Sequence, residues 1–214
     1  MSKAPVVSAV SAFYNRGPYV ASSVGSLLTQ SLAELEIIIV DDGSTDDTAA
    51  ELAKLADHRL HVIAQDNAGF VVSMNRAIRA SSGRYVAVHG SGDISLPERL
   101  ERQAAYLDAN PDVGVLGCAI GSQGRVWGKQ IDRAPLLEKA LESNPFAHGE
   151  VMFRRDLFDK VGGYREIFRF AQDRDLWLRM GRHCNYAVLG EKLYDRFYLP
   201  DGVGRNAEKV FLQM

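Results

Sequence analysis

The chain has 214 residues, and its 25 Lys and Arg against 27 Asp and Glu leave a net charge of −2. Hydrophobic residues make up 46% of it, which excludes an intrinsically disordered chain and allows a large core. The balanced charge argues against a nucleic-acid partner, because such proteins offer excess positive charge to phosphates. Cys118 and Cys184 are expected to be free thiols in a reducing, cytoplasmic compartment. No stretch approaches the roughly 20 apolar residues of a membrane span.

The first half of the chain alternates short apolar runs with helical patterns. The apolar runs predict strands over residues 6–13, 36–40, 60–64 and 85–89, and helices are expected over 20–28, 44–56, 69–81 and 95–109. The run EIIIV is apolar on both faces, which is typical of a central strand. Capping boxes are expected at Ser44 with Asp47 and at Ser95 with Glu98. This alternation predicts an open parallel α/β sheet.

The second half is less regular. Its patterns predict strands over residues 113–120, 125–129, 150–153, 187–189 and 193–198, and helices over 134–142, 156–161 and 173–183. A polar tail that includes Arg205 and Asn206 follows. The sequence shows no internal repeat, no low-complexity segment and no linker.

Polar residues follow three of the predicted strands, in segments 12–16, 41–44 and 89–93. Ligands of open parallel sheets bind at the carboxyl ends of the strands, so these segments are expected to share one rim. Each segment alone is typical of a helix-capping loop, whereas three together favour a binding site. A dinucleotide site is excluded because only Gly17, followed by Pro18, stands after the first strand, and the Walker A pattern is also absent.

An ordered set of motifs over about residues 5–190 resembles the family 2 glycosyltransferases of the GT-A fold. The motifs are VSAVSAFYNRGPYVASSVGSLLTQSLAELEIIIVDDGSTDDT, Asn67-x-Gly69 with Asn75, GRY at 83–85, LPERL at 96–100, HGEVMFRR at 148–155, VGGY at 161–164 and DRDLWLR at 173–179. The resemblance implies an α/β GT-A fold, with a Rossmann-like, mostly parallel central sheet flanked by helices and a smaller acceptor-side subregion. It implies one domain over 1–214, with a nucleotide-binding half at about 5–110 and an acceptor half at about 111–200.

The same resemblance implies an enzyme that moves a sugar from a nucleotide-diphosphate donor, usually a UDP-sugar, to an acceptor hydroxyl, with inversion at the anomeric carbon. The acceptor would be a saccharide or a lipid-linked saccharide. Many relatives build bacterial surface polysaccharides, so the expected location is cytoplasmic, at the inner face of the cell membrane, with at most peripheral attachment. The oligomeric state stays open, as does a membrane or assembly segment beyond Met214 in a longer parent protein.

Donor-binding roles carry over from the family residue by residue. Tyr14 matches the ring that packs on the base, and Asp42 matches the carboxylate that accepts the base N–H. Asp41 would support the strand end or the ribose. Asn75 and Arg76 match positions that line the nucleotide pocket, although Met74 stands where the family commonly has an arginine. For Asn75, the alternative is a helix-face residue that bonds a neighbouring loop.

Asp173 matches the general base of the family, although Gln172 precedes it where a glutamate is usual. The base takes a proton from the attacking hydroxyl, and a helix dipole would keep its carboxylate ionised. The alternative is that Asp173 only caps the helix. His148 matches a position near the acceptor, with a structural hydrogen bond as the alternative. Asp175 is expected to be structural.

The metal-binding signature Asp-x-Asp falls on Gly90, Ser91 and Gly92, so Asp93 is the one carboxylate left there. Asp93 could hold Mn²⁺ or Mg²⁺ together with diphosphate oxygens and water, and a His89 nitrogen would favour Mn²⁺. Ser91 is a candidate substrate-binding residue. Without a metal, cationic side chains must neutralise the departing diphosphate. The candidates for this role are Arg76, Arg79, Lys129, Arg154 and Arg155.

Three interpretations follow from the altered signature. The first is an active transferase whose metal requirement is weakened or absent. The alternative is a catalytically impaired relative that binds a nucleotide sugar or a partner. The third is an engineered or degenerate variant of an active enzyme. The presence of Tyr14, Asp42 and Asp173 together favours activity.

Overall fold

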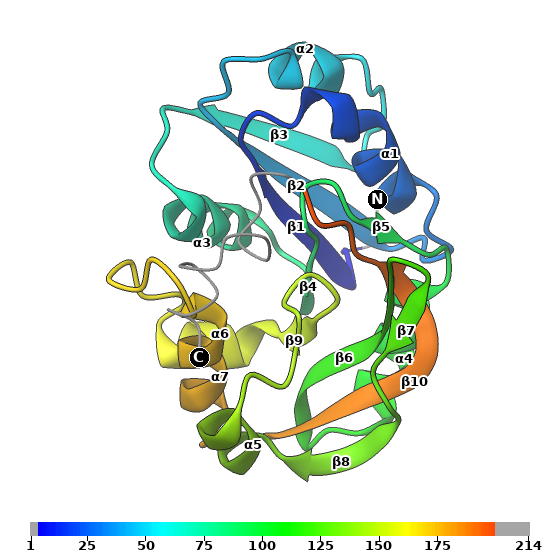
Figure 1. The fold of residues 1–214 in the computed structure, drawn as a ribbon, viewed down its shortest axis with the longest axis vertical. Coiled ribbons are helices and arrows are strands. Elements are labelled where there is room, and N and C mark those ends of the chain that lie inside the picture. The colour runs from blue at the N-terminus through cyan, green and yellow to red at the C-terminus, as the bar shows by residue number, and fades with distance from the viewer. Residues whose placement is uncertain (1–3, 200–214) are drawn as a thin grey trace.

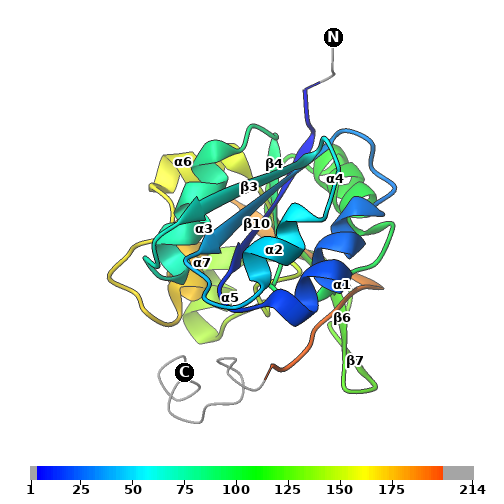
Figure 2. The same ribbon diagram turned by 90° about the horizontal axis from the view of Figure 1, so that it is seen from above.

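The computed structural model describes residues 4–199; residues 1–3 and 200–214, which include Arg205 and Asn206 of the polar tail, lie outside the described part. The fold is an α/β architecture built on a ten-stranded sheet in the order β3-β2-β1-β4-β9-β6-β10-β5, with β7 and β8 paired beside this path (Figure 1). Helices cover both faces of the sheet (Figure 2). This arrangement confirms the α/β fold class.

The first half forms the expected parallel layer. Its strands are β1 (Val7–Phe13), β2 (Leu35–Asp42), β3 (Leu60–Gln65) and β4 (Tyr85–Val88), followed by the short β5 (Ile94–Ser95). Its helices are α1 (Gly17–Leu28), α2 (Thr48–Ala53), α3 (Phe70–Ala80) and α4 (Arg99–Ala109). β1 pairs in parallel with β2 and β4, and β2 with β3. The carboxyl ends of these strands therefore share one rim.

The second half continues the sheet with mixed pairing. Its strands are β6 (Val113–Ser122), β7 (Arg125–Trp127), β8 (Ile131–Pro135), β9 (Met152–Arg154) and β10 (Asn185–Asp195), and its helices are α5 (Leu136–Glu142), α6 (Arg155–Val161) and α7 (Gln172–Met180). β9 runs antiparallel to both β4 and β6 and so joins the two halves. β10 is parallel to β6 but antiparallel to β5 and β8. The parallel order therefore dominates only in the first half.

Alternate residues of the central strands enter two separate cores. Ile37 and Ile39 of β2 pack with α1 and α4 on one face of the sheet. Ile38 and Val40 of the same strand pack with α3, α6 and α7 on the other face. These two helix layers are visible on opposite sides of the sheet in Figure 2. Burial of both faces explains why this strand reads as a continuous apolar run.

Both predicted capping boxes are wrong. The helix after β2 begins at Thr48, and the hydroxyl of Ser44 instead accepts a hydrogen bond from the Asn15 amide at 3.0 Å. The helix after β5 begins at Arg99, and the Ser95 hydroxyl accepts a hydrogen bond from the guanidinium of Arg99 at 2.8 Å. The Asn15 amide and the Arg99 guanidinium therefore bond these two hydroxyls, which do not cap the helices, because a hydroxyl inside the fold needs a hydrogen bond wherever the fold supplies one.

Two further boundaries differ from the expectation. The predicted strand 187–189 and residues 193–195 of the predicted strand 193–198 belong to one strand, β10, whose pairing with β6 shifts register between Leu189 and Tyr194; residues 196–198 are not in a strand. The predicted helix over 134–142 begins two residues later, because β8 extends to Pro135 in pairing with β10. Among residues 4–199, no helix has the length and apolar character required to cross a membrane.

Candidate active site

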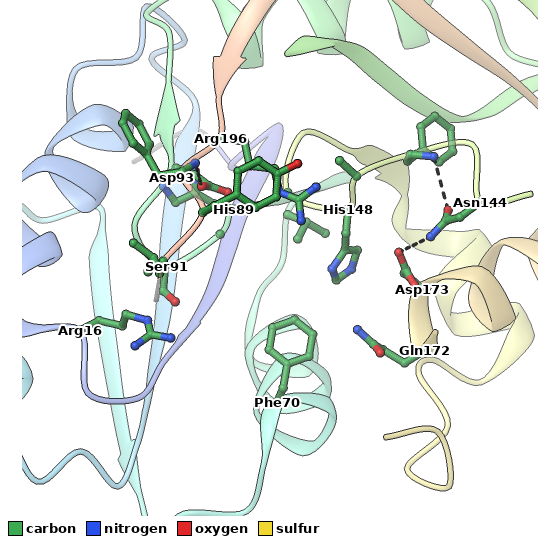
Figure 3. Close-up of a pocket in the computed structure, with 18 of the residues that line it drawn as sticks. Arg16, Phe70, His89, Ser91, Asp93, Asn144, His148, Gln172, Asp173 and Arg196 are labelled. Atoms are coloured by element: carbon green, nitrogen blue, oxygen red, sulfur yellow. Dashed lines mark hydrogen bonds between the residues drawn. The ribbon is translucent and has the colours of Figure 1, made fainter. Parts of the chain in front are cut away.

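A cavity of about 430 Å³ lies where the rim of the first half meets the loops of the second half (Figure 3). Its lining comes from the segment before α1, the start of α3, the turn after β4, the loop before β9, the start of α7 and the segment after β10. The residues are Arg16, Phe70, Val88–Ser91, Asp93, Asn144, Phe146–Gly149, Ala171–Asp173 and Arg196–Leu199. Of the residues predicted for the site, it brings together Ser91, Asp93, His148 and Asp173.

Asp173 lies in the first turn of α7 and is only 8% exposed. One carboxylate oxygen, Oδ2, accepts a hydrogen bond from the Asn144 side-chain amide at 2.6 Å, and Oδ1 accepts one from the Arg174 backbone amide at 2.9 Å. Ala171, just before the helix, has φ +55° and turns the chain into it. The Asn144 and Arg174 donors orient the carboxylate at the wall of the cavity. Asp173 can therefore accept a proton in the cavity.

His148 lies between the two walls of the cavity in Figure 3. Its φ of +80° places the ring edge-on against Phe70 and Trp177. Burial lowers the pKa of His148, while burial raises the pKa of Tyr164 well above its ordinary value. The hydroxyl of Tyr164 and Nε2 of His148 share a hydrogen bond of 2.7 Å. This bond and the lowered pKa hold the imidazole as a neutral, positioned group.

The turn after β4 is packed around Asp93. Oδ2 of Asp93 accepts a hydrogen bond from the Tyr194 hydroxyl at 2.8 Å, and Oδ1 accepts one from the Phe197 amide at 2.8 Å. Burial raises the pKa of Asp93. A Cβ added at Gly90 would stand 2.2 Å from Oδ2, and Gly92 has φ +127°, a conformation that side-chain-bearing residues rarely adopt. A side chain at position 90 would therefore have to displace the Asp93 carboxylate, and the backbone at position 92 favours glycine; these are the two positions where the resemblance leads one to expect aspartate.

His89 cannot serve as the metal ligand that the sequence suggested. Its ring nitrogens face the hydroxyls of Ser23 at 2.9 Å and Ser95 at 3.2 Å, and burial lowers its pKa to about 3. The carboxylate of Asp93 accepts two hydrogen bonds and keeps about two acceptor sites. Residues 4–199 contain no group of three or more His, Cys, Asp and Glu side chains that could hold a metal ion. The described side chains do not form a cation site by themselves, and a divalent cation at Asp93 would need diphosphate oxygens and water as its other ligands.

The predicted base-binding residues lie at the same rim but outside the cavity lining. Phe13 pairs with Asp41 in the β1–β2 ladder, so Tyr14 and Asp42 follow side by side at the strand ends. Tyr14 is 45% exposed, whereas both aspartates are buried. Oδ1 of Asp41 accepts a hydrogen bond from the Ser44 amide at 3.1 Å, which supports the strand end.

The carboxylate of Asp42 is tied to the chain that leads into α3. Oδ1 accepts hydrogen bonds from the Gln65 side chain at 2.7 Å and the Ala68 amide at 2.8 Å, and Oδ2 accepts one from the Gly69 amide at 2.9 Å. Arg76 is exposed and donates a hydrogen bond to the side-chain amide oxygen of Gln65, Oε1, at 2.9 Å. It therefore reaches Asp42 only through the Gln65 side chain. A carboxylate has about four acceptor sites, so one remains for a ligand.

Two polar helix residues hold the second half in place. The Asn75 amide donates to the Tyr164 carbonyl at 2.9 Å and accepts from the Tyr164 backbone N–H at 3.0 Å, so it bonds a neighbouring loop and does not line the cavity. Asn75 is thus the helix-face residue that bonds a neighbouring loop, the alternative to a pocket-lining role. Asp175 forms an ion pair with Arg179 at 2.7 Å, which confirms its structural role.

The cavity contains different cations from those predicted. Arg154 donates a hydrogen bond to the Leu107 carbonyl at 2.6 Å, and Arg155 donates one to the Gly83 carbonyl at 2.6 Å. Both side chains therefore support the backbone. Arg76, Arg79 and Lys129 do not line the cavity either. The cations that line the cavity are instead Arg16 and Arg196 (Figure 3).

Sequence reasoning missed most of the lining residues, including Arg16, Phe70, Asn144 and Arg196. Arg16 belongs to a polar strand end that had been singled out, so position in that segment was a usable signal. Periodicity gives no signal for the other three, because Phe70 stands at a helix start and Asn144 and Arg196 lie in irregular segments.

Comparisons with known proteins agree with this geometry. Residues 8–174 match the family model described as glycosyl transferase family 2. EpsE of Bacillus subtilis (strain 168), which carries a glycosyltransferase name, is 31% identical over 191 residues, covering 84% of this chain and 68% of EpsE. The O-antigen biosynthesis glycosyltransferase WbnJ of Escherichia coli is 29% identical over 190 residues, covering 84% of this chain and 73% of WbnJ.

Solved structures share the fold. S. aureus TarS in complex with UDP superposes with a TM-score of 0.77 at 22% identity, covering 91% of this chain and 61% of that one. The mannosyltransferase PcManGT from Pyrobaculum calidifontis, in complex with GDP-Man and Mn²⁺, gives a TM-score of 0.68 at 21% identity, covering 94% of this chain and 59% of that one. This chain thus spans about three fifths of the length of these two structures. The family match over residues 8–174 and the shared GT-A fold lead to one assignment: the chain belongs to glycosyl transferase family 2.

Proposed function

We propose that this protein transfers a sugar from a nucleotide-diphosphate donor, a UDP-sugar, to a hydroxyl of a saccharide or lipid-linked saccharide acceptor. The observation that carries the proposal is the position of Asp173. Its carboxylate forms one wall of the cavity, and Ser91, Asp93 and Arg16 lie on the opposite wall (Figure 3). Asp173 can accept a proton on one side of the cavity, and Arg16 offers positive charge on the other side. This arrangement suits a displacement at a sugar carbon.

The donor nucleotide would lie along the rim of the first half. The half-exposed ring of Tyr14 offers a flat face on which the base can stack. The remaining acceptor site of Asp42 would receive the N–H of uracil, and Asp41 would keep its loop in place for the ribose. Support for UDP comes from S. aureus TarS, which has been solved with UDP and with UDP-GlcNAc.

Asp173 would act as the general base. It removes the proton from the acceptor hydroxyl as that oxygen attacks the anomeric carbon, while the bond between this carbon and the diphosphate oxygen breaks. Inversion follows when base and diphosphate lie on opposite sides of the sugar. Asn144 holds the carboxylate by its 2.6 Å hydrogen bond, and His148 would contact the acceptor with Nδ1, the ring nitrogen that is not bonded to Tyr164.

The departing diphosphate needs positive charge, and Arg16 and Arg196 supply it from within the cavity. PcManGT was solved with Mn²⁺, but here the carboxylate of Asp93 is engaged by Tyr194 and Phe197. We therefore assign charge neutralisation to the arginines and Ser91 to the donor phosphates, and leave the response to added metal to experiment.

The wider context is the synthesis of a bacterial surface polysaccharide at the cytoplasmic face of the membrane. Two relatives support it by name: WbnJ, for O-antigen, and AmsE of Erwinia amylovora, for amylovoran, which is 29% identical over 163 residues. The chain would act as a single domain over 1–214, with nucleotide and acceptor halves that meet at the cavity.

The test is a thermal-shift and turnover panel of UDP, UDP-GlcNAc, UDP-glucose and GDP-mannose, with Mn²⁺, with Mg²⁺ and with a chelator. We expect UDP-containing ligands to raise the melting temperature and acceptor saccharides to stimulate UDP release. Stabilisation by UDP without product under any metal would instead support the nucleotide-sugar-binding module. No stabilisation by any nucleotide would contradict both.

A further inference from the structure

A second cavity, of about 250 Å³, lies beside the first. Phe146 and Ala147 line both cavities, so the loop that carries them forms a common wall. The other residues of the second cavity come from β6, β7, the segment that leads into β8, the start of β8, β10 and the loop between α5 and β9. They are Cys118, Ile120, Trp127–Lys129, Ile131, Pro145, Glu150 and Val188. Asn144, which holds Asp173, belongs to the same loop, so the second cavity adjoins the proposed base.

Glu150 is the unusual member of this lining. Its side chain is 4% exposed, and Oε1 accepts a hydrogen bond from the Ala147 amide at 2.9 Å. Oε2 is buried and has no hydrogen-bond partner among residues 4–199. Burial raises the pKa of this carboxyl group. A buried oxygen without a donor is costly, and a rotation of the Glu150 side chain that turns Oε2 toward the cavity would let a ligand hydroxyl relieve that cost.

Trp127 gives the cavity an apolar face. It pairs across the β6–β7 ladder with Ile120, so both side chains stand on the same side of this hairpin and both line the cavity. Trp127 is nevertheless 54% exposed, which is unusual for so large an apolar ring. Lys129 also lines the cavity and offers an ammonium donor.

We propose that this second cavity binds a pyranose unit of the acceptor. A pyranose ring has C–H bonds on its faces, which suit the Trp127 ring, and hydroxyls around its edge, which suit Oε2 of Glu150 and the Lys129 ammonium. The shared loop would then keep the bound unit next to the cavity that holds Asp173. The proposal rests on the transferase function for its biological meaning, but binding can be measured without turnover.

Trp127 itself provides the probe. The chain has two tryptophans, and Trp177 is fully buried, so iodide quenches chiefly the fluorescence of Trp127. The methyl α- and β-glycosides of glucose, galactose and mannose, added singly, are the ligands. We expect at least one to protect Trp127 from iodide with millimolar affinity, and Glu150→Gln to weaken that affinity about tenfold, since a hydroxyl–carboxylate hydrogen bond is lost.

Val126→Ala is the matched control, because Val126 lies beside Trp127 on β7 but does not line this cavity. It should leave protection unchanged. Trp127→Ala, at an exposed position where folding is not at risk, should raise the KM for the acceptor glycoside about tenfold and leave the KM for the donor unchanged. Circular dichroism checks that Glu150→Gln folds, and Lys129→Ala serves as a second variant with the quenching readout.

The outcomes separate this proposal from the transferase function. Protection that depends on Glu150 and Lys129 in the absence of any sugar transfer would support the cavity and contradict the transferase. Sugar transfer with an acceptor KM that Trp127→Ala does not change would support the transferase and overturn the cavity. Absence of protection by every glycoside, or equal loss in Val126→Ala, would also overturn it.

Discussion

The two halves of the sheet build their parts of the site in different ways. In the first half, parallel strands end at one rim, and residues such as Asp42 extend directly from those ends. In the second half, His148 and Ala171 occupy positive-φ positions in loops, and these loops place the cavity wall around Asp173. The proposed nucleotide platform therefore follows mainly from the strand ends, whereas the proposed catalytic wall depends on how the loops pack. The following predictions test this division, from the largest expected effect to the smallest.

Asp173→Asn should lower kcat about a thousandfold, because an amide cannot accept the proton of the acceptor hydroxyl. The affinity for UDP, measured by calorimetry, should not change, since the base-binding rim belongs to the other half. Asp175→Asn is the control: it breaks the ion pair with Arg179 and should lower stability while kcat is retained. An equal loss of kcat in both variants would contradict the role given to Asp173.

Gly90→Ala should destabilise the fold by about 3 kcal/mol, since the new Cβ would meet an Asp93 carboxylate that Tyr194 and Phe197 hold in place. Urea unfolding measures the change. Gly25→Ala in α1, where a Cβ would meet nothing within 4 Å, should stabilise by less than about 1 kcal/mol. Equal stability of the two variants would mean that this turn can accept an aspartate after all.

His89 should make the protein less stable as the pH falls. Its pKa is about 3 in the folded state against 6.5 for the free side chain, so the unfolded chain binds more protons. Between about pH 6.5 and pH 5 the loss from this residue is about 2 kcal/mol. Because burial raises the pKa of Asp93 and of Glu150, these groups act with the opposite sign.

Urea unfolding of the wild type and of His89→Gln at both pH values isolates the histidine, since the carboxyl contributions are common to the two proteins. The wild type should lose more stability than the variant on acidification. Identical pH profiles would show that His89 is not the buried neutral group that joins α1 to β4.

Arg196→Gln should raise the dissociation constant for UDP about tenfold, because a charge-assisted hydrogen bond to phosphate is lost. Arg133→Gln is the matched control: its side chain is 63% exposed and pairs with Asp112 away from the cavity. Calorimetry at two salt concentrations should show a weaker salt dependence for Arg196→Gln alone. If both variants bind UDP like the wild type, the cationic wall does not include Arg196.

Much of the first half could be predicted from the sequence, because β1, β2 and β4 carry local apolar patterns that match their burial. The capping boxes failed because Ser44 bonds Asn15, which is distant in the sequence, and Ser95 bonds the side chain of Arg99 in place of a backbone amide. Asp175 was correctly expected to be structural, while Arg154 and Arg155 were expected to face the diphosphate and instead support backbone carbonyls.

The sequence by itself determined the fold class, the family and the altered turn at Gly90 to Asp93, because apolar periodicity and ordered motifs are local properties of the chain. Only the tertiary structure decided which charges meet in the cavity. Arg16 and Arg196 are 180 positions apart by their numbers, and only the packing of the two halves brings both to one cavity. The structure also explained the altered turn, since Asp93, held by Tyr194 and Phe197, fills the space that a side chain at position 90 would need.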